Sequence, residues 1–133
     1  MATEHTTNES TEIVRQFQAG LNANDFSVVD RYVAPSYVSH DPNIPSDKTE
    51  WKLFLAEMAK AHYEYYTSID EVYEEEGKVY VKLTEEYRQI RALFGNPPDF
   101  KRCRKTCVEA FAVAGGLITE VFPPRVLRHR ILT

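Results

Sequence analysis

The first part of the chain has the pattern of hydrophobic and polar positions that is typical of amphipathic helices. Ser10 can cap a first helix, which ends near residues 22–24. The residues before it, 1–9, are polar and predict a flexible tail. The apolar positions of this helix recur every three to four residues and are Ile13, Val14, Phe17 and Leu21.

Two more helices are predicted before the pattern changes. Asp25 can cap a short second helix, and Pro35 ends it because the residue before a proline disfavours the helical conformation. A loop over residues 36–45 follows. Residues 46–50 supply caps for a third helix, which should stop near His62. Its apolar stripe consists of Trp51, Phe54, Leu55, Met58 and Ala59.

After the third helix the chain becomes rich in tyrosine, valine, threonine and isoleucine, which favour strands. Gly77 and the pair Gly115-Gly116 mark tight turns between strands. Helices followed by a meander of strands predict an α+β fold with a cavity between the two layers. The four expected antiparallel strands cover about residues 63–74, 78–93, 101–113 and 117–127.

Length and composition limit the possible classes of protein. With 133 residues, of which 43% are hydrophobic, the chain (1–133) is expected to form a single domain. A net charge of −4 and only one short basic run, Lys101–Lys105, argue against a nucleic-acid partner. The apolar runs are shorter than the roughly 20 residues of a membrane span, and we expect a cytoplasmic protein with no membrane partner.

The two cysteines, Cys103 and Cys107, would point to one face of a strand about 13 Å apart, which is too far for a disulfide. We interpret them as reduced, and we expect no metal site because no second pair of ligands accompanies them.

The segment His40-Asp41-Pro42 carries two groups that can move protons at one chain reversal. Histidine titrates near neutral pH, whereas an aspartate needs an apolar environment for that. Adjacent residues of an extended segment point to opposite sides, so one of the pair should face the cavity. The alternative is structural: Asp41 caps the turn and His40 lies at the surface.

Glu109 is the second candidate for acid–base chemistry. Strand alternation places it on one face with Lys105, Cys107 and Phe111, which is mostly apolar. A carboxyl group there either has a raised pKa and donates a hydrogen bond or pairs with a cation. Lys105 and Arg91 are the nearby cations for the structural alternative.

Polar residues also continue the inward face of the second expected strand. Glu85, Tyr87 and Arg91 share the phase of Val81 if no bulge intervenes. They could line the cavity mouth, where Tyr87 and Arg91 would bind substrate oxygens, or form a solvated or dimer-facing strand end. Aromatic residues are the remaining candidates, as ligand contacts or as ordinary core. The full set of candidate substrate-binding residues is Phe17, Tyr37, Trp51, Phe54, Tyr65, Glu85, Tyr87, Arg91 and Phe111.

The order of these segments resembles the SnoaL-like polyketide cyclases of the NTF2-like superfamily, from about residue 10 to 122. The resemblance implies a cone in which three N-terminal helices pack on a curved four-stranded antiparallel sheet. The segments that carry it, besides the helices, are Tyr37–Pro42, residues 79–84, Gly95–Pro98, the acid two residues before Phe111, and residues 115–120.

Ketosteroid isomerases of this superfamily offer a comparison residue by residue. Asp41 matches the position of their base aspartate before a proline, and Glu109 matches their protonated acid on the third strand. Phe17 stands where they have a tyrosine that binds the oxyanion, so this hydroxyl is missing. The polyketide cyclases usually carry a histidine and an acid on the last strand, where this chain has Val121 and a Pro-Pro-Arg-Val stretch.

The resemblance implies a cofactor-free isomerase or cyclase of secondary metabolism that acts on a carbonyl-bearing polyketide or terpenoid intermediate. Asp41 or His40 would remove the proton, and Glu109 would donate to the oxygen or orient it. The expected partners are a small hydrophobic metabolite and a second copy of the chain, bound through the outer sheet face. The competing hypothesis is a non-catalytic binding or dimerisation module; an epoxide hydrolase is a third, weakened by the lack of an Asp-Arg-Asp set.

Overall fold

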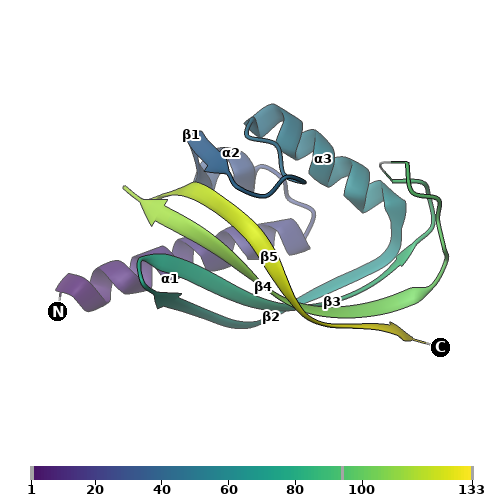
Figure 1. The fold of residues 1–133 in the computed structure, drawn as a ribbon. Coiled ribbons are helices and arrows are strands. Elements are labelled where there is room, and N and C mark those ends of the chain that lie inside the picture. Colours follow the sequence, from purple (N-terminus) through teal and green to yellow (C-terminus); the bar gives the residue numbers. More distant parts are fainter. Residues whose placement is uncertain (1, 94, 133) are drawn as a thin grey trace.

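Three helices lie on the concave side of one curved sheet (Figure 1). The computed structural model describes residues 2–93 and 95–132, without the side chains of residues 2–8 and 62–64. No helix in these ranges is long and apolar enough to cross a membrane. The helices are α1 (Ala2–Asn22), α2 (Val28–Tyr32) and α3 (Lys48–Ala61).

The sheet has five strands in the order β1-β5-β4-β3-β2. Four of them form the predicted antiparallel meander, with turns at Gly77 and at Gly115-Gly116. The fifth was not predicted: β1 pairs in parallel with β5, so the sheet is mixed. The strand bounds are β1 (Val33–Ser39), β2 (His62–Glu75), β3 (Lys78–Gln89), β4 (Arg102–Ala114) and β5 (Leu117–Leu132).

The prediction of a loop from residue 36 onward was therefore wrong for the first residues of that segment. Helix α2 does end before Pro35, as expected, but the chain then enters an edge strand. An edge strand tolerates proline because one side of its backbone needs no ladder partner. The partner residues are distant, since Ser39 pairs with Val121, and no local pattern indicates such a pairing.

The first helix differs from its prediction at its beginning. It starts at Ala2, ahead of Ser10, where the sequence places the helix start. The flexibility expected for residues 1–9 stays a prediction. The third helix ends at Ala61, one residue from the expected stop, and the Asp47 carboxylate caps its start by accepting a hydrogen bond from the Glu50 N–H at 3.0 Å.

An aromatic cluster joins the layers. The fully buried ring of Phe17 on α1 lies 5.6 Å from Trp51 on α3 and 5.9 Å from Phe111 on β4, measured between ring centroids. Tyr37 on β1 packs against Trp51 from the other side, at 5.3 Å. Such pairs add to the free energy gained from burial, so one contact group holds α1, α3 and two strands at fixed distances.

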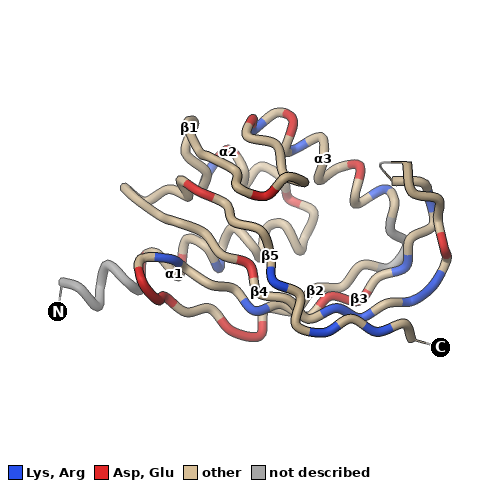
Figure 2. The backbone as a smooth tube through the Cα atoms, in the orientation of Figure 1, with Lys and Arg blue, Asp and Glu red and all other residues tan. Residues whose placement is uncertain are grey.

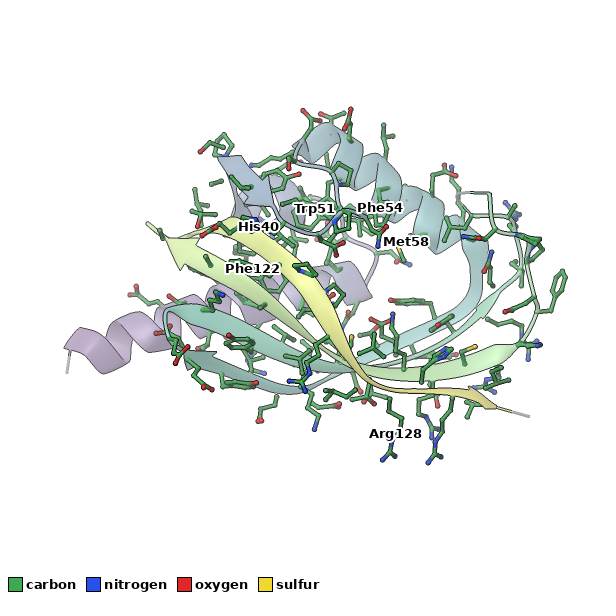
Figure 3. The ribbon with its side chains drawn as sticks, in the orientation of Figure 1. His40, Trp51, Phe54, Met58, Phe122 and Arg128 are labelled. Atoms are coloured by element: carbon green, nitrogen blue, oxygen red, sulfur yellow. The ribbon has the colours of Figure 1, made fainter. Side chains whose placement is uncertain are left out.

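Basic residues are frequent along β4 and the end of β5 (Figure 2). Arg104 lies opposite Arg130 on the neighbouring strand, and Arg128 points away from the helices (Figure 3). The Glu86 carboxylate accepts two hydrogen bonds from Arg104, at 2.6 and 2.8 Å, and offsets part of this charge. The homodimer expected through the outer sheet face stays a prediction.

Helix α1 approaches α2 closely at Gly20. A Cβ atom at this position would lie 2.2 Å from Val28 Cγ1, a distance that no packed pair of carbons reaches. Val28 is buried and β-branched, so its side chain has little freedom to move away. We predict that Gly20→Ala lowers the free energy of unfolding by about 1–3 kcal/mol, measured by urea denaturation, although alanine favours helices over glycine.

The control for this prediction removes Val28 Cγ1, the atom that would clash with the new Cβ. In a Val28→Ala background the added methyl group has room, so Gly20→Ala should cost clearly less than in the wild type. A higher melting temperature for the single variant would contradict the close contact.

Candidate active site

A cavity of about 460 Å³ lies between the helices and the concave face of the sheet. Most of the residues that line it are apolar. Helix α3 contributes Trp51, Phe54 and Met58 from one face, and their side chains point toward the sheet (Figure 3). Phe17 and Leu21 of α1 and Phe111 of β4 add to this wall.

Asp41 reaches the cavity directly after β1. The backbone N–H of the preceding residue, His40, donates to the Val121 carbonyl at 2.8 Å, which fixes the chain to β5 at this point. The Asp41 side chain is buried, with 6% of its surface exposed, and lines the cavity. Its Oδ1 atom accepts a hydrogen bond from the Asn43 N–H at 2.9 Å. The two interpretations of Asp41 are thus compatible, because one carboxylate caps the turn and also faces the cavity.

His40 lies outside the cavity wall. Its Nε2 atom is 2.8 Å from Glu120 Oε1, and both side chains are more than 40% exposed. Its ring stacks on Phe122 with the centroids 4.9 Å apart (Figure 3). Of the adjacent pair, therefore, the structure directs Asp41 inward and His40 outward.

Three charged residues of β3 and β4 also line the cavity. Glu85 is buried, with 8% exposed, and its Oε2 lies 3.7 Å from Lys105 Nζ. Glu109 follows on the same face of β4 as Lys105, as strand alternation predicts. Among the described residues, Lys105 forms its ion pair with Glu85 and not with Glu109.

The pKa of Glu109 is raised to about 7. Desolvation by burial is the largest cause, and the carboxylate of Glu85 adds to it; Lys105 opposes the shift, while Asp41 raises the pKa slightly further. At neutral pH this carboxyl group exists in both protonation states. It can therefore donate a proton or a hydrogen bond where an ordinary glutamate would only accept.

Tyr65 supplies a hydroxyl group to the same wall. Its pKa is raised by burial and by the nearby Glu85 carboxylate, so this phenol stays protonated and can donate. Its ring lies 6.2 Å from that of Tyr87. No group of three histidine, cysteine, aspartate or glutamate side chains in the described part of the chain is arranged to hold a metal ion.

Most of the candidate residues meet at this cavity. Those that line it are Phe17, Asp41, Trp51, Phe54, Tyr65, Glu85, Glu109 and Phe111. Their catalytic and binding roles stay predictions.

Three predicted substrate contacts lie elsewhere. Tyr37 is buried in the core and its hydroxyl donates to the Pro45 carbonyl. Tyr87 lies beyond the cavity wall, with its hydroxyl 3.4 Å from His129 Nε2. Arg91 is exposed and follows the end of β3, because the chain leaves the strand ladder there: the Ile90 N–H donates to the Ala61 carbonyl at 2.8 Å. The expected extension of this strand to residue 93 was wrong.

Polar residues of α1 were missing from the predicted site. Gln18 and Asn22 line the cavity one helical turn apart, beside Phe17 and Leu21. Gln18 is buried, with 6% exposed. A sequence signal exists, since Gln18 lies between Val14 and Leu21 within the apolar stripe of this helix. Lys105, which the sequence suggests only as an ion-pair partner of Glu109, also lines the cavity.

The comparisons with known proteins agree with this architecture. Residues 14–121 match the family model of the SnoaL-like domain, and the chain belongs to this family, within the NTF2-like superfamily. No curated protein matches the chain.

Solved structures with the same fold come from several bacteria. A proposed SnoaL-like polyketide cyclase from Jannaschia sp. CCS1 superposes with a TM-score of 0.77 at 16% identity, covering 91% of this chain and 87% of the other. TsrD from Streptomyces laurentii gives a TM-score of 0.73 at 17% identity, with coverages of 93% and 88%. An LEH-like epoxide hydrolase of M. tuberculosis gives 0.68 at 17% identity, with coverages of 91% and 84%. At these identities the likeness shows the fold alone.

The raised pKa of Glu109 predicts a pH dependence of stability. The native state keeps this proton up to about pH 7, whereas the unfolded chain releases it near 4.5. The free energy of unfolding should therefore fall as the pH rises between these values, by about 2–3 kcal/mol from this group. Glu109→Gln should remove that part of the decline, measured by urea denaturation at several pH values.

Glu57→Gln on the exposed side of α3 is the matched control, since this side chain is 62% exposed. It should leave the pH profile of stability unchanged. Parallel profiles for the wild type and Glu109→Gln between pH 4.5 and 7 would contradict the raised pKa.

Proposed function

We propose that this protein is a cofactor-free isomerase or cyclase that uses general acid–base catalysis on a carbonyl-bearing, largely apolar metabolite. The observation that carries the proposal is that two carboxyl groups from distant segments, Asp41 and Glu109, line one cavity together with many apolar side chains. The solved structures of the same fold that are described as polyketide cyclases support a polyketide intermediate as the substrate class, and a terpenoid intermediate is the alternative that we propose.

The two carboxyl groups have different environments and thus suit different roles. The Asp41 carboxylate would remove a proton from the carbon next to the carbonyl, and the C–H electron pair would form the double bond of an enol. Glu109 would donate its proton, or a hydrogen bond, to the oxygen that gains charge. Return of a proton to another carbon completes an isomerisation, whereas attack of the enol carbon on a second carbonyl closes a ring.

The substrate oxygen that gains charge needs a hydrogen-bond donor, and Phe17 has no hydroxyl group to act as one. The Phe17 ring is buried between Trp51 and Phe111, and its position offers no hydroxyl. Tyr65, which stays protonated, is a second donor on the wall that carries Glu109. The remaining apolar side chains would exclude water and hold the substrate in a reactive shape.

A non-catalytic module that binds a small molecule is the second candidate. Phe17 favours it, because the tyrosine that polarises the carbonyl in ketosteroid isomerases is absent here. An epoxide hydrolase fits less well, since Lys105 is the sole cation among the described residues that line the cavity and no arginine joins the carboxylates.

Proton abstraction can be tested without the natural substrate. We predict that the protein accelerates the exchange of the α-hydrogens of 2-tetralone with D₂O, followed by proton NMR. Asp41→Asn should reduce this acceleration about 100-fold, and Glu109→Gln about 10-fold or more, because a base and an oxyanion donor each contribute on this scale. His40→Ala should stay within a few-fold of the wild type, because His40 lies outside the cavity wall.

Circular dichroism and melting temperatures establish that each variant is folded. The binding module is favoured if the wild type binds 2-tetralone without accelerating exchange. Full exchange activity in both folded carboxyl variants would refute the assignment of Asp41 and Glu109.

A further inference from the structure

The sheet side of the cavity carries a cation whose hydrogen-bond donors are not in use. Lys105 lines the cavity, and 29% of its side chain is exposed, so a bound molecule can contact it. Its Nζ atom lies 3.7 Å from Glu85 Oε2, a distance that makes an ion pair but is too long for a hydrogen bond. No other described residue accepts a hydrogen bond from this ammonium group. Its three N–H donors are therefore available to a ligand.

The strand register holds this ammonium group in place. Glu85 on β3 lies directly opposite Lys105 on β4, and its carboxylate also accepts a hydrogen bond from the Cys107 thiol at 3.9 Å. Burial alone would lower the pKa of Lys105, but the charge of Glu85 and of groups near it outweighs burial and raises the pKa above its ordinary value. Lys105 is therefore a permanent cation at neutral pH, and Glu85 fixes its position without using its hydrogens.

The proposed chemistry moves negative charge toward this cation. Asp41 follows β1, whereas Lys105 and Glu109 share the inward face of β4. When Asp41 takes the proton from carbon, the C–H electron pair forms the new double bond and the π pair of the carbonyl passes to its oxygen. Asp41 becomes neutral and the oxygen becomes an anion, so the total charge in the cavity does not change. A fixed cation beside that oxygen stabilises the enolate more than the neutral ketone, and such a difference accelerates the reaction.

We propose that Lys105 is a further catalytic residue, which donates a hydrogen bond from Nζ to the substrate oxygen that gains charge. The inference rests on the proposed function, because that reaction creates the charge. It supplies a charged donor in a cavity where Phe17 supplies none, and it makes Glu85 a positioning residue for the ammonium group. It also places the reacting carbonyl of the substrate against the sheet.

A pair of variants isolates the ammonium group from its partner. Lys105→Met alone would leave the buried Glu85 carboxylate unpaired, which is strongly destabilising. The comparison is therefore between Glu85→Gln and the double variant Glu85→Gln/Lys105→Met, which differ only at Lys105. Circular dichroism and melting temperatures establish that both are folded.

Two measurements on this pair test the proposal. In the exchange assay with 2-tetralone, the double variant should be about 100-fold slower than Glu85→Gln, the scale on which a lost oxyanion donor acts. The second measurement uses 4-nitrophenol, whose anionic oxygen is conjugated like that of an enolate and whose anion absorbs visible light. The apparent pKa of the bound phenol should be about 1–2 pH units higher in the double variant, because the nearby cation is gone. A lysine that only supports the fold would leave this pKa unchanged.

Lys60→Met/Glu57→Gln is the matched control. It removes an exposed ion pair of α3 with a similar separation, 3.6 Å between Nζ and Oε1. It should keep both the exchange rate and the apparent pKa of the bound phenol at their wild-type values.

If the wild type catalyses exchange, both effects must appear. Equal exchange rates in the two variants, equal pKa values of the bound phenol, or no binding of 4-nitrophenol by the wild type would each overturn the role of Lys105 and leave the proposed function standing. A wild type without exchange refutes the proposed function instead, and the pKa of the bound phenol then decides alone whether Lys105 binds an anionic oxygen.

Discussion

The carboxyl groups in the cavity are the constraint around which the site is built. Three of them, Asp41, Glu85 and Glu109, share the cavity with the ammonium group of Lys105, the sole cation among the described residues that line it. Water cannot screen these charges fully, so not all three carboxylates can be ionised at low cost. The ion pair between Glu85 and Lys105 and the turn around Asp41 each stabilise one charge, and the remaining group, Glu109, holds its proton to an unusually high pH.

This distribution gives each wall of the cavity a different character. The sheet wall presents a proton that can be given up near neutral pH, the loop after β1 presents a carboxylate, and α1 presents a neutral amide. A ligand in the cavity therefore contacts three kinds of polar group among many apolar side chains. Such a division fits a substrate with a few oxygens on a hydrocarbon frame.

Much of this site could be predicted from the sequence where the chain follows a regular period. Strand alternation placed Glu109 and Phe111 on the inward face of β4, and the structure agrees because the register between β3 and β4 has no irregularity. The regular ladder ends at Gln89, and for that reason the expected strand does not extend to residue 93 and Arg91 lies outside the cavity wall. The chain leaves the ladder at Gln89, whose side-chain amide donates to the Arg91 and Asn96 carbonyls and holds a loop there. Nothing in the alternation of polar residues marks that exit.

The direction of the Asp41 side chain toward the cavity depends on the pairing of β1 with β5, which no local sequence pattern indicates. Strand β1 has three aligned residue pairs with β5, and these fix which of two adjacent residues faces the cavity. Gln18 differs, because its place between Val14 and Leu21 in the apolar stripe of α1 can be seen in the sequence. A polar residue inside such a stripe is informative about a site as well as about a helix.

The pairing of β1 with β5 also has a consequence for how the molecule is made. Ser39 emerges from the ribosome long before Val121, its partner in the sheet. A nascent chain can therefore form helices and the β2–β3 hairpin while the segment that carries Asp41 still has no strand to join. Contacts so distant along the chain slow folding. The cavity acquires the Asp41 carboxyl group only when the last strand is complete, and a chain released early would have an incomplete cavity wall.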